Sequence, residues 1–218
     1  MSIFCGNSDC LDRSSYLPAE DGKFRRFEEL GLRVRSFAQL EIHDRLYPRK
    51  LAEILGVKVL TLDEIDGISD EVRRVLSDSP SQWSGGATPV LPDGSRIVIL
   101  NPWQSNERQA ATLMEEICHI LLGHKHSQIK SDNAAGSDQH RSYDRDIEEE
   151  AYAVGAAALV PFRSLKCDLL AGKSIKLISR HFGVTTSLVK FRIQALRLIP
   201  TMVDNLTQKA HKTHYRTQ

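Results

Sequence analysis

The stretch LMEEICHILLGH, Leu113–His124, places two carboxylates and an imidazole in an otherwise apolar segment. Residues four apart project from one face of a helix, so Glu115 and His119 can converge on a common point while Glu116 lies beside it. Such a group can hold a divalent metal ion and a general base. In zinc hydrolases of this geometry the pattern is His-Glu-x-x-His, where two imidazoles bind the ion and the Glu deprotonates its water. Here Glu115 replaces the first imidazole.

A third ligand must come from another buried helix, and IEEEAYAVGAAALVP, Ile147–Pro161, provides the only obvious one. On a helical wheel Glu148 shares a face with Ala151 and Gly155, small residues that allow the two helices to approach closely. The two glutamates that follow Glu148 lie over other faces. We therefore expect Glu148 to be the inward carboxylate.

These two motifs, in this order and at this distance, resemble the ImmA/IrrE family of metallopeptidases. The family pattern is His-Glu-x-x-His, often running on to Leu-Leu-Gly-His, and a later helix of the type Glu-x-x-Ala-Asn-x-Phe-Ala ends in Leu-Leu-Met-Pro. The resemblance covers roughly Leu51–Pro161. It implies a mainly helical, zincin-like α+β domain with a small antiparallel sheet, and regulated cleavage of a protein such as a transcriptional repressor.

Carried over by position, the resemblance implies Glu116 as general base and His119 and Glu148 as metal ligands, with Glu115 in the place of the first ligand His. A Glu/His/Glu set is harder and more anionic than two His and a Glu. We therefore expect a divalent metal, zinc first, with Mn²⁺ or Fe²⁺ favoured more than in the usual site.

Two further residues are expected behind the ligands, with a role as substitute ligand left open for His124. His124 follows the helix-ending Gly123 and fits the Leu-Gly-His of the family. Tyr152 stands where the family usually has Asn or Asp. The residues leave other interpretations open: an inactive relative that binds a repressor or DNA without cutting, or exposed carboxylates beside a core histidine.

Hydropathy periods and turn residues predict the other elements. Helices are expected at Phe27–Tyr47, ended by Pro48, and at Arg49–Leu55, Asp63–Leu76, Glu107–Leu122 and a buried Asp146–Val160; strands are expected at Val57–Leu60, Thr88–Leu91 and Arg96–Leu100, the last two as a hairpin. A substrate peptide is expected as an extra strand along this hairpin near Ile97–Leu100.

The C-terminal part of the chain is strongly basic, although the 218 residues have a net charge of only +1. From Phe162 onwards there are eleven Lys and Arg residues against two Asp and Glu. Within this part, LISRHFGVTTSLVKFRI, Leu177–Ile193, predicts a helix, a glycine turn and a second helix capped by Thr185 or Thr186.

This segment looks like a helix-turn-helix unit, and a basic surface suits a polyanion. The residues expected on one accessible face, contacting DNA or a DNA-bound repressor, are Arg180, Lys190, Arg192 and Arg197. The alternative is a helical lid docked on the peptidase region.

The predicted organisation is a flexible arm (1–24), a peptidase-like domain (25–165), the helix-turn-helix-like unit (166–200) and a basic tail (201–218). With 41% hydrophobic and 26% charged residues, the composition is that of a globular protein and excludes whole-chain disorder, collagen or a coiled coil. The longest nearly uncharged apolar stretch, Ala151–Phe162, is short of the roughly 20 residues that cross a bilayer. We expect a cytoplasmic protein with no membrane partner and with reduced cysteines.

Overall fold

The computed structural model describes residues 17–18, 22–65, 67–78, 82–124 and 145–198. Most of the predicted N-terminal arm, the polar loop before the second motif and the basic tail lie outside these residues. The elements are α1 (Lys23–Phe37), α2 (Pro48–Ile54), β1 (Val57–Thr61), the 3₁₀ turn η3 (Leu62–Glu64), α3 (Asp70–Asp78), β2 (Gly85–Ala87), β3 (Arg96–Leu100), α4 (Asn106–Leu122), α5 (Arg145–Leu159), α6 (Phe162–Leu170), α7 (Ile175–Phe182) and α8 (Thr186–Ala195). None of the described helices is both long and apolar enough to cross a membrane.

A three-stranded sheet and a larger helical part confirm the predicted α+β class, but the sheet is mixed rather than antiparallel. The strand order is β1-β3-β2, with β1 parallel and β2 antiparallel to β3. The chain crosses over through α3 between β1 and β3, and such a crossover is what makes two strands parallel. Strand β3 is therefore central, and its two edges are already paired.

The hairpin pairs β3 with Gly85–Ala87, not with the predicted Thr88–Leu91. Beyond β2 the ladder continues irregularly, since Leu91 N–H donates to the Ser95 carbonyl at 2.9 Å. Two glycines are poor strand formers, which hid this strand from the sequence pattern. A Cβ on Gly85 would lie 2.8 Å from both the Ile99 carbonyl oxygen and Thr112 Cγ2 of α4. Glycine here allows α4 to approach the edge strand.

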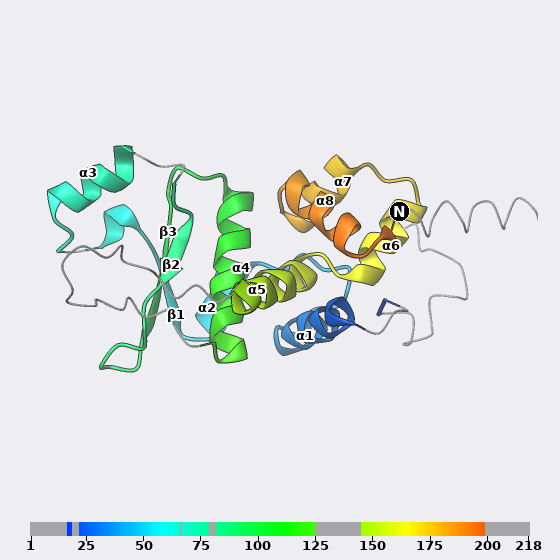
Figure 1. The fold of residues 1–218 in the computed structure, drawn as a ribbon, viewed down its shortest axis with the longest axis horizontal. Coiled ribbons are helices and arrows are strands. Elements are labelled where there is room, and N and C mark those ends of the chain that lie inside the picture. The colour runs from blue at the N-terminus through cyan, green and yellow to red at the C-terminus, as the bar shows by residue number, and fades with distance from the viewer. Residues whose placement is uncertain (1–16, 19–21, 66, 79–81, 125–144, 199–218) are drawn as a thin grey trace, which may run out of the picture.

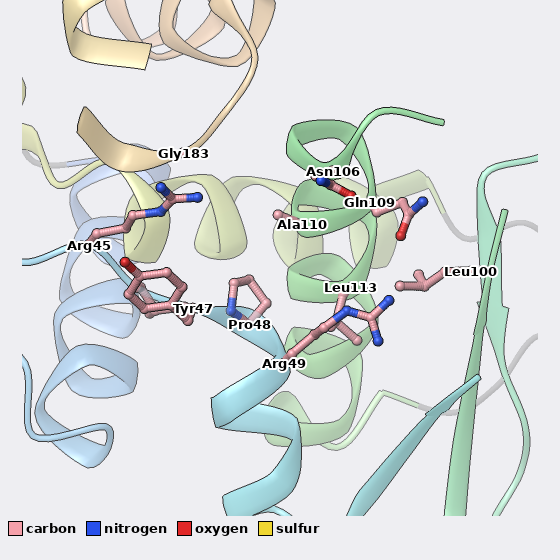
Figure 2. A pocket seen from close by; sticks show the side chains of 11 residues that line it. Arg45, Tyr47, Pro48, Arg49, Leu100, Asn106, Gln109, Ala110, Leu113 and Gly183 are labelled. Carbon is pink, nitrogen blue, oxygen red and sulfur yellow. The ribbon is translucent and has the colours of Figure 1, made fainter. Parts of the chain in front are cut away.

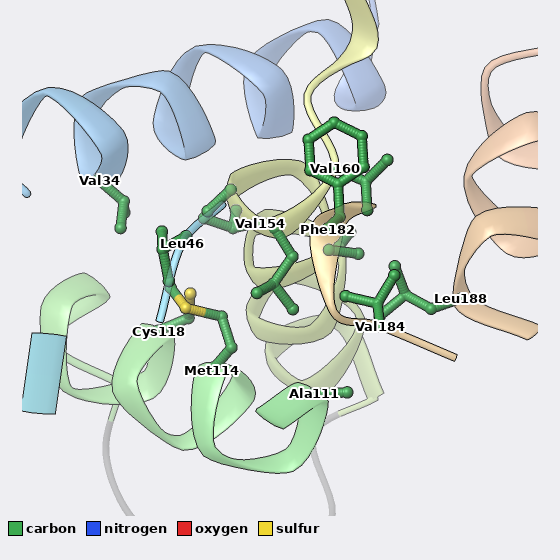
Figure 3. Packing of buried hydrophobic residues seen from close by; sticks show 14 of the residues in the cluster. Val34, Leu46, Ala111, Met114, Cys118, Val154, Val160, Phe182, Val184 and Leu188 are labelled. Atoms are coloured by element: carbon green, nitrogen blue, oxygen red, sulfur yellow. The ribbon is translucent and has the colours of Figure 1, made fainter. Parts of the chain in front are cut away.

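Helix α5 lies at the centre of the helical part, with α4 on one side and α1 on another (Figure 1). Small residues set these contacts: a Cβ on Gly155 would lie 3.3 Å from Met114 Cγ, and one on Gly31 would lie 2.8 Å from Ala157 Cβ. Met114 and Cys118 of α4 and Val154 of α5 belong to one buried cluster (Figure 3). The close approach of α4 and α5 that the small residues predicted is thus present.

Helix α1 ends at Phe37, ten residues before the predicted end. Leu40 and Ile42 continue the helical spacing in the sequence, but Gln39 has a left-handed backbone (φ 56°) that stops the helix. The buried Arg35 holds the segment that follows, because its guanidinium donates to the carbonyls of Glu41, Asp44 and Ala158. Pro48 is the first residue of α2 rather than the end of a longer helix.

The C-terminal helices α7 and α8 are joined through Gly183, and Thr185 caps α8 by accepting from Leu188 N–H at 3.1 Å. The expectation that Arg192 lies on an accessible face is wrong, because its side chain is 1% exposed. It follows Leu188 by four positions and so shares the inward face of α8. Its guanidinium binds the Glu28 carboxylate of α1 and the Val160 carbonyl.

Candidate metal centre

Helix α4 carries the first motif and is well delimited at both ends. Ser105 accepts from Arg108 N–H at its start, and Gly123 in the left-handed region ends it, with His124 N–H bonded to the His119 carbonyl at 3.0 Å. The faces toward the sheet and α5 bury Leu113, Met114, Ile117 and Cys118. Glu115 and His119 are half-buried at the margin of this core.

Glu115, His119 and Glu148 converge, each offering a ligand atom within 4.8 Å of the other two. The His119 Nε2 and Glu148 Oε2 atoms lie 3.4 Å apart. Ligand atoms about 2.0 to 2.2 Å from a tetrahedral ion lie about 3.3 to 3.6 Å from each other. The donor set and this spacing fit a divalent ion held between α4 and α5.

The cluster carries more negative than positive charge. Burial, followed by the charges of Glu116 and Glu148, raises the pKa of Glu115 to about 7, and Arg108 opposes the shift. Carboxylates brought together in a partly buried place repel one another, and a cation between them removes that cost. The electrostatics therefore agree with the donor geometry.

The three consecutive glutamates at the start of α5 point to different partners. Glu148 faces His119, Glu149 pairs with Lys23 of α1 at 2.5 Å, and Glu150 contacts Arg26. The helical wheel predicted Glu148 as the inward carboxylate. The observed geometry selects the same residue.

His124 lies against His119, where the sequence placed it behind the ligands. The two rings meet edge to face, with their Nδ1 atoms 3.1 Å apart, and His124 Nε2 is 3.2 Å from Glu150 Oε2. Sequence reasoning missed Glu150 and Arg26. The wheel put Glu150 over another face of α5, and Arg26 comes from a helix more than a hundred residues away, so no local pattern relates them.

Tyr152 is half-buried and packs edge to face on Phe191 of α8, with ring centroids 5.0 Å apart. Burial and the Glu115 charge raise its pKa. Glu116, the expected base, is half-buried in the same turn of α4 as Glu115. Cys118 is fully buried, which raises its thiol pKa well above the ordinary value. A buried neutral thiol is a core residue and not a nucleophile.

The opposite face of α4 borders a groove of about 330 Å³ lined by Arg45, Tyr47, Arg49 and Gln109, among others (Figure 2). Arg180 lines an adjoining hollow that shares Arg45 with it. Of the four basic residues expected to share a surface, Arg180, Lys190 and Arg197 are exposed while Arg192 is not.

The sequence profile of one family, described as Peptidase_M78, IrrE N-terminal-like domain, matches residues 52–194. The chain belongs to this family. The ImmA/IrrE resemblance found in the two motifs is therefore confirmed, and this Peptidase_M78 chain carries Glu115 where the resemblance would place a histidine.

No curated protein matches this Peptidase_M78 chain. Among solved structures it is similar to a Mycobacterium tuberculosis transcriptional regulator, with a TM-score of 0.48 and 14% identity over 77% of this chain and 46% of that one. The chain thus spans less than half the length of that protein.

Proposed function

We propose that the protein is a metal-dependent endopeptidase that cleaves a regulatory protein such as a transcriptional repressor. The observation that carries this proposal is the convergence of Glu115, His119 and Glu148 within 4.8 Å, with Glu116 beside them on α4. Membership of a metallopeptidase family supports it. Zinc is the proposed ion, with Mn²⁺ or Fe²⁺ as candidates because two of the three donors are carboxylates.

A divalent ion at this place supplies the Lewis acidity that polarises a scissile carbonyl and a water molecule. The residues of the chain bind the ion and transfer the proton. Glu115, His119 and Glu148 hold the ion between two helices that are fixed by close packing. Glu116 accepts the proton of the water and returns it to the leaving amine, as a general acid–base group does.

The substrate strand needs a free sheet edge, and β3 does not provide one. The peptide expected along the hairpin near Ile97–Leu100 therefore cannot pair with β3 itself, because β1 and β2 already occupy both edges of β3. Among the described strands, β2 has an unpaired edge and also contacts α4, through the close approach of Gly85 and Thr112. We place the substrate along β2, where backbone pairing holds an extended peptide.

The test compares two variants with the wild-type protein in two measurements: cleavage of a repressor-type substrate and the metal content of the purified protein. Glu116→Gln keeps the shape but cannot accept a proton, so cleavage falls about 10²- to 10⁴-fold while the bound metal is retained. His119→Ala should lose both the cleavage activity and the bound metal. Wild-type cleavage by Glu116→Gln would exclude Glu116 as the base.

The competing function is that of a non-catalytic regulator that binds a repressor or DNA, and Glu115 in place of a ligand His is the observation that favours it. In that case purified protein carries no metal, and no substrate is cut. DNA contact would use the exposed residues Arg180, Lys190 and Arg197 of the C-terminal unit, since Arg192 is buried.

A further inference from the structure

We infer that Arg26, Glu150 and His124 form a positioning chain that fixes the Nδ1 proton of His119 and thereby leaves Nε2 of His119 directed at Glu148 and the ion. The inference rests on the proposed metal centre and assigns a role to three residues outside its ligand set. Each of the three acts on the ion through another residue, so each is a positioning residue.

The chain of contacts is continuous and links three segments. Arg26 of α1 lies 3.2 Å from Glu150 Oε1 of α5, and Glu150 Oε2 lies 3.2 Å from His124 Nε2. His124 Nδ1 then lies 3.1 Å from His119 Nδ1. The His124 side chain is only 9% exposed, so its contacts with Glu150 and His119 are largely sheltered from water.

With His124 in its neutral form, the carboxylate at one end sets the direction of the hydrogen bonds along the chain. Ionised Glu150 can only accept, so His124 must donate from Nε2. A neutral His124 then has a bare Nδ1, which can only accept, and His119 must donate from its own Nδ1. The remaining nitrogen of His119 is Nε2, which lies 3.4 Å from Glu148 Oε2. Fixing the tautomer and ring plane of a ligand histidine in this way strengthens its hold on a metal ion.

Arg26 contributes orientation more than energy. Its side chain is 71% exposed, and an exposed ion pair adds little stability. By occupying Oε1, however, it turns Oε2 of Glu150 toward His124. The division of the two oxygens between Arg26 and His124 is what gives the carboxylate one orientation.

The same contacts argue against His124 as a replacement for the missing ligand histidine. Both of its ring nitrogens are engaged, Nδ1 with His119 and Nε2 with Glu150. A ligand role would require one of these contacts to break. The arrangement therefore places His124 behind His119.

The first test needs no metal. In ¹⁵N-labelled, metal-free protein at neutral pH, long-range ¹H–¹⁵N correlation of the ring nitrogens should show His124 protonated at Nε2 and bare at Nδ1, with His119 protonated at Nδ1. A proton on His124 Nδ1, either alone or together with one on Nε2, would overturn the inference. This readout stands even if the protein binds no ion, whereas absence of binding by Zn²⁺ and Mn²⁺ overturns the proposed metal centre.

The second test measures the Zn²⁺ dissociation constant by competition with a chromophoric chelator. His124→Ala should weaken binding about 10- to 100-fold, and His124→Asn should recover much of the loss because its side-chain oxygen can accept from His119 Nδ1. Glu150→Gln should weaken binding, while Glu149→Gln, one position away and paired with Lys23, should not. Equal loss in the Ala and Asn variants, or in the Glu149 and Glu150 variants, would contradict the chain and indicate a purely structural role.

Discussion

Two clusters of charge lie against α5, one buried and one half-buried, and they differ in how completely they are paired. Glu28 and Arg192 are each 1% exposed and bind each other, and their remaining atoms bind the Phe162 N–H and the Val160 carbonyl at 3.1 Å each. At the candidate metal centre, Glu115 and Glu148 converge with the His119 imidazole, Glu116 lies next to Glu115 on α4, and the pKa of Glu115 rises to about 7. The first cluster is complete within the protein, whereas the second has a surplus of anionic donors.

The difference separates an ion pair that holds the fold together from a set of donors that suits a cation. A buried ion pair with satisfied hydrogen bonds fixes α8 and the start of α6 against α1. A surplus of buried carboxylates costs stability unless a cation joins them. Four experiments can break or sharpen this contrast.

Removing one partner of the complete pair has the largest expected effect. Glu28→Ala leaves the guanidinium of Arg192 buried without its carboxylate and the Phe162 N–H without its acceptor, so the free energy of unfolding should fall by about 3 to 5 kcal/mol. Urea denaturation measures the change. The matched control is Glu29→Ala, whose i,i+4 partner Arg25 is near the surface and which should lose about 0.3 to 0.5 kcal/mol. Similar losses in both variants would show that the buried pair has no special role.

Adding a divalent cation should stabilise the second cluster. With free Zn²⁺ at 100 times its dissociation constant, the wild-type free energy of unfolding should rise by about 2.7 kcal/mol. Thermal unfolding with and without the ion measures this. His119→Ala and Glu148→Gln should lose most of the gain, and Glu28→Ala should keep it if it folds. An unchanged melting temperature in wild type would mean that the cluster binds no zinc.

The surplus of carboxylates should also make metal-free stability depend on pH. The folded-state pKa of Glu115, about 7, lies above its ordinary value of 4.5, so the folded chain keeps a proton that the unfolded chain releases. Stability should therefore fall as the pH rises from about 4.5 to 7 and then level off.

Glu115→Gln removes this dependence. The variant should be more stable than wild type by about 1 to 3 kcal/mol at pH 8, with the difference vanishing toward pH 5. Urea denaturation of metal-free protein across this range measures it, with Glu149→Gln as the control. If the difference in the free energy of unfolding between the variant and wild type grew toward low pH, it would contradict the raised pKa of Glu115.

The smallest effect concerns the exposed basic residues, which belong to neither cluster. Arg180→Glu and Lys190→Glu should change the free energy of unfolding by less than about 0.5 kcal/mol. If the C-terminal unit binds DNA, each change should weaken DNA binding. The slope of log affinity against log salt concentration should also become shallower, by the amount that about one phosphate contact contributes. Fluorescence anisotropy with a labelled duplex at several salt concentrations tests this, and affinities that do not depend on salt would exclude DNA as the partner.

Local sequence patterns predicted the helices that carry the site. The apolar spacing and Gly123 fixed the C-terminal end of α4, and Ala151 and Gly155 indicated which glutamate of α5 faces α4. These features depend on neighbours within one helix turn. The convergence of Glu115 and His119 follows from their spacing alone.

Features set by distant partners were not predictable. The parallel pairing of β1 with β3 depends on a crossover, and β2 is a strand because Gly85 fits under α4, not because its residues favour strands. Arginine is a residue type expected at the surface, yet Arg192 is buried because Glu28 lies opposite it on another helix. Nothing near Arg192 in the sequence indicates that partner.

The close contact of Gly31 with Ala157 has a practical consequence for where the folded unit that carries the candidate site begins. Helix α1 precedes the family-matched span, residues 52–194, yet it supplies Arg26 to the histidine chain and Glu28 to the buried pair. Gly31 sets how near α1 lies to α5, so a Gly31→Ala change would push both side chains outward together. A fragment that begins at residue 52 would lack Arg26 and Glu28. Low activity of such a fragment in a peptidase assay would therefore reflect its disturbed fold and not the chemistry of the site.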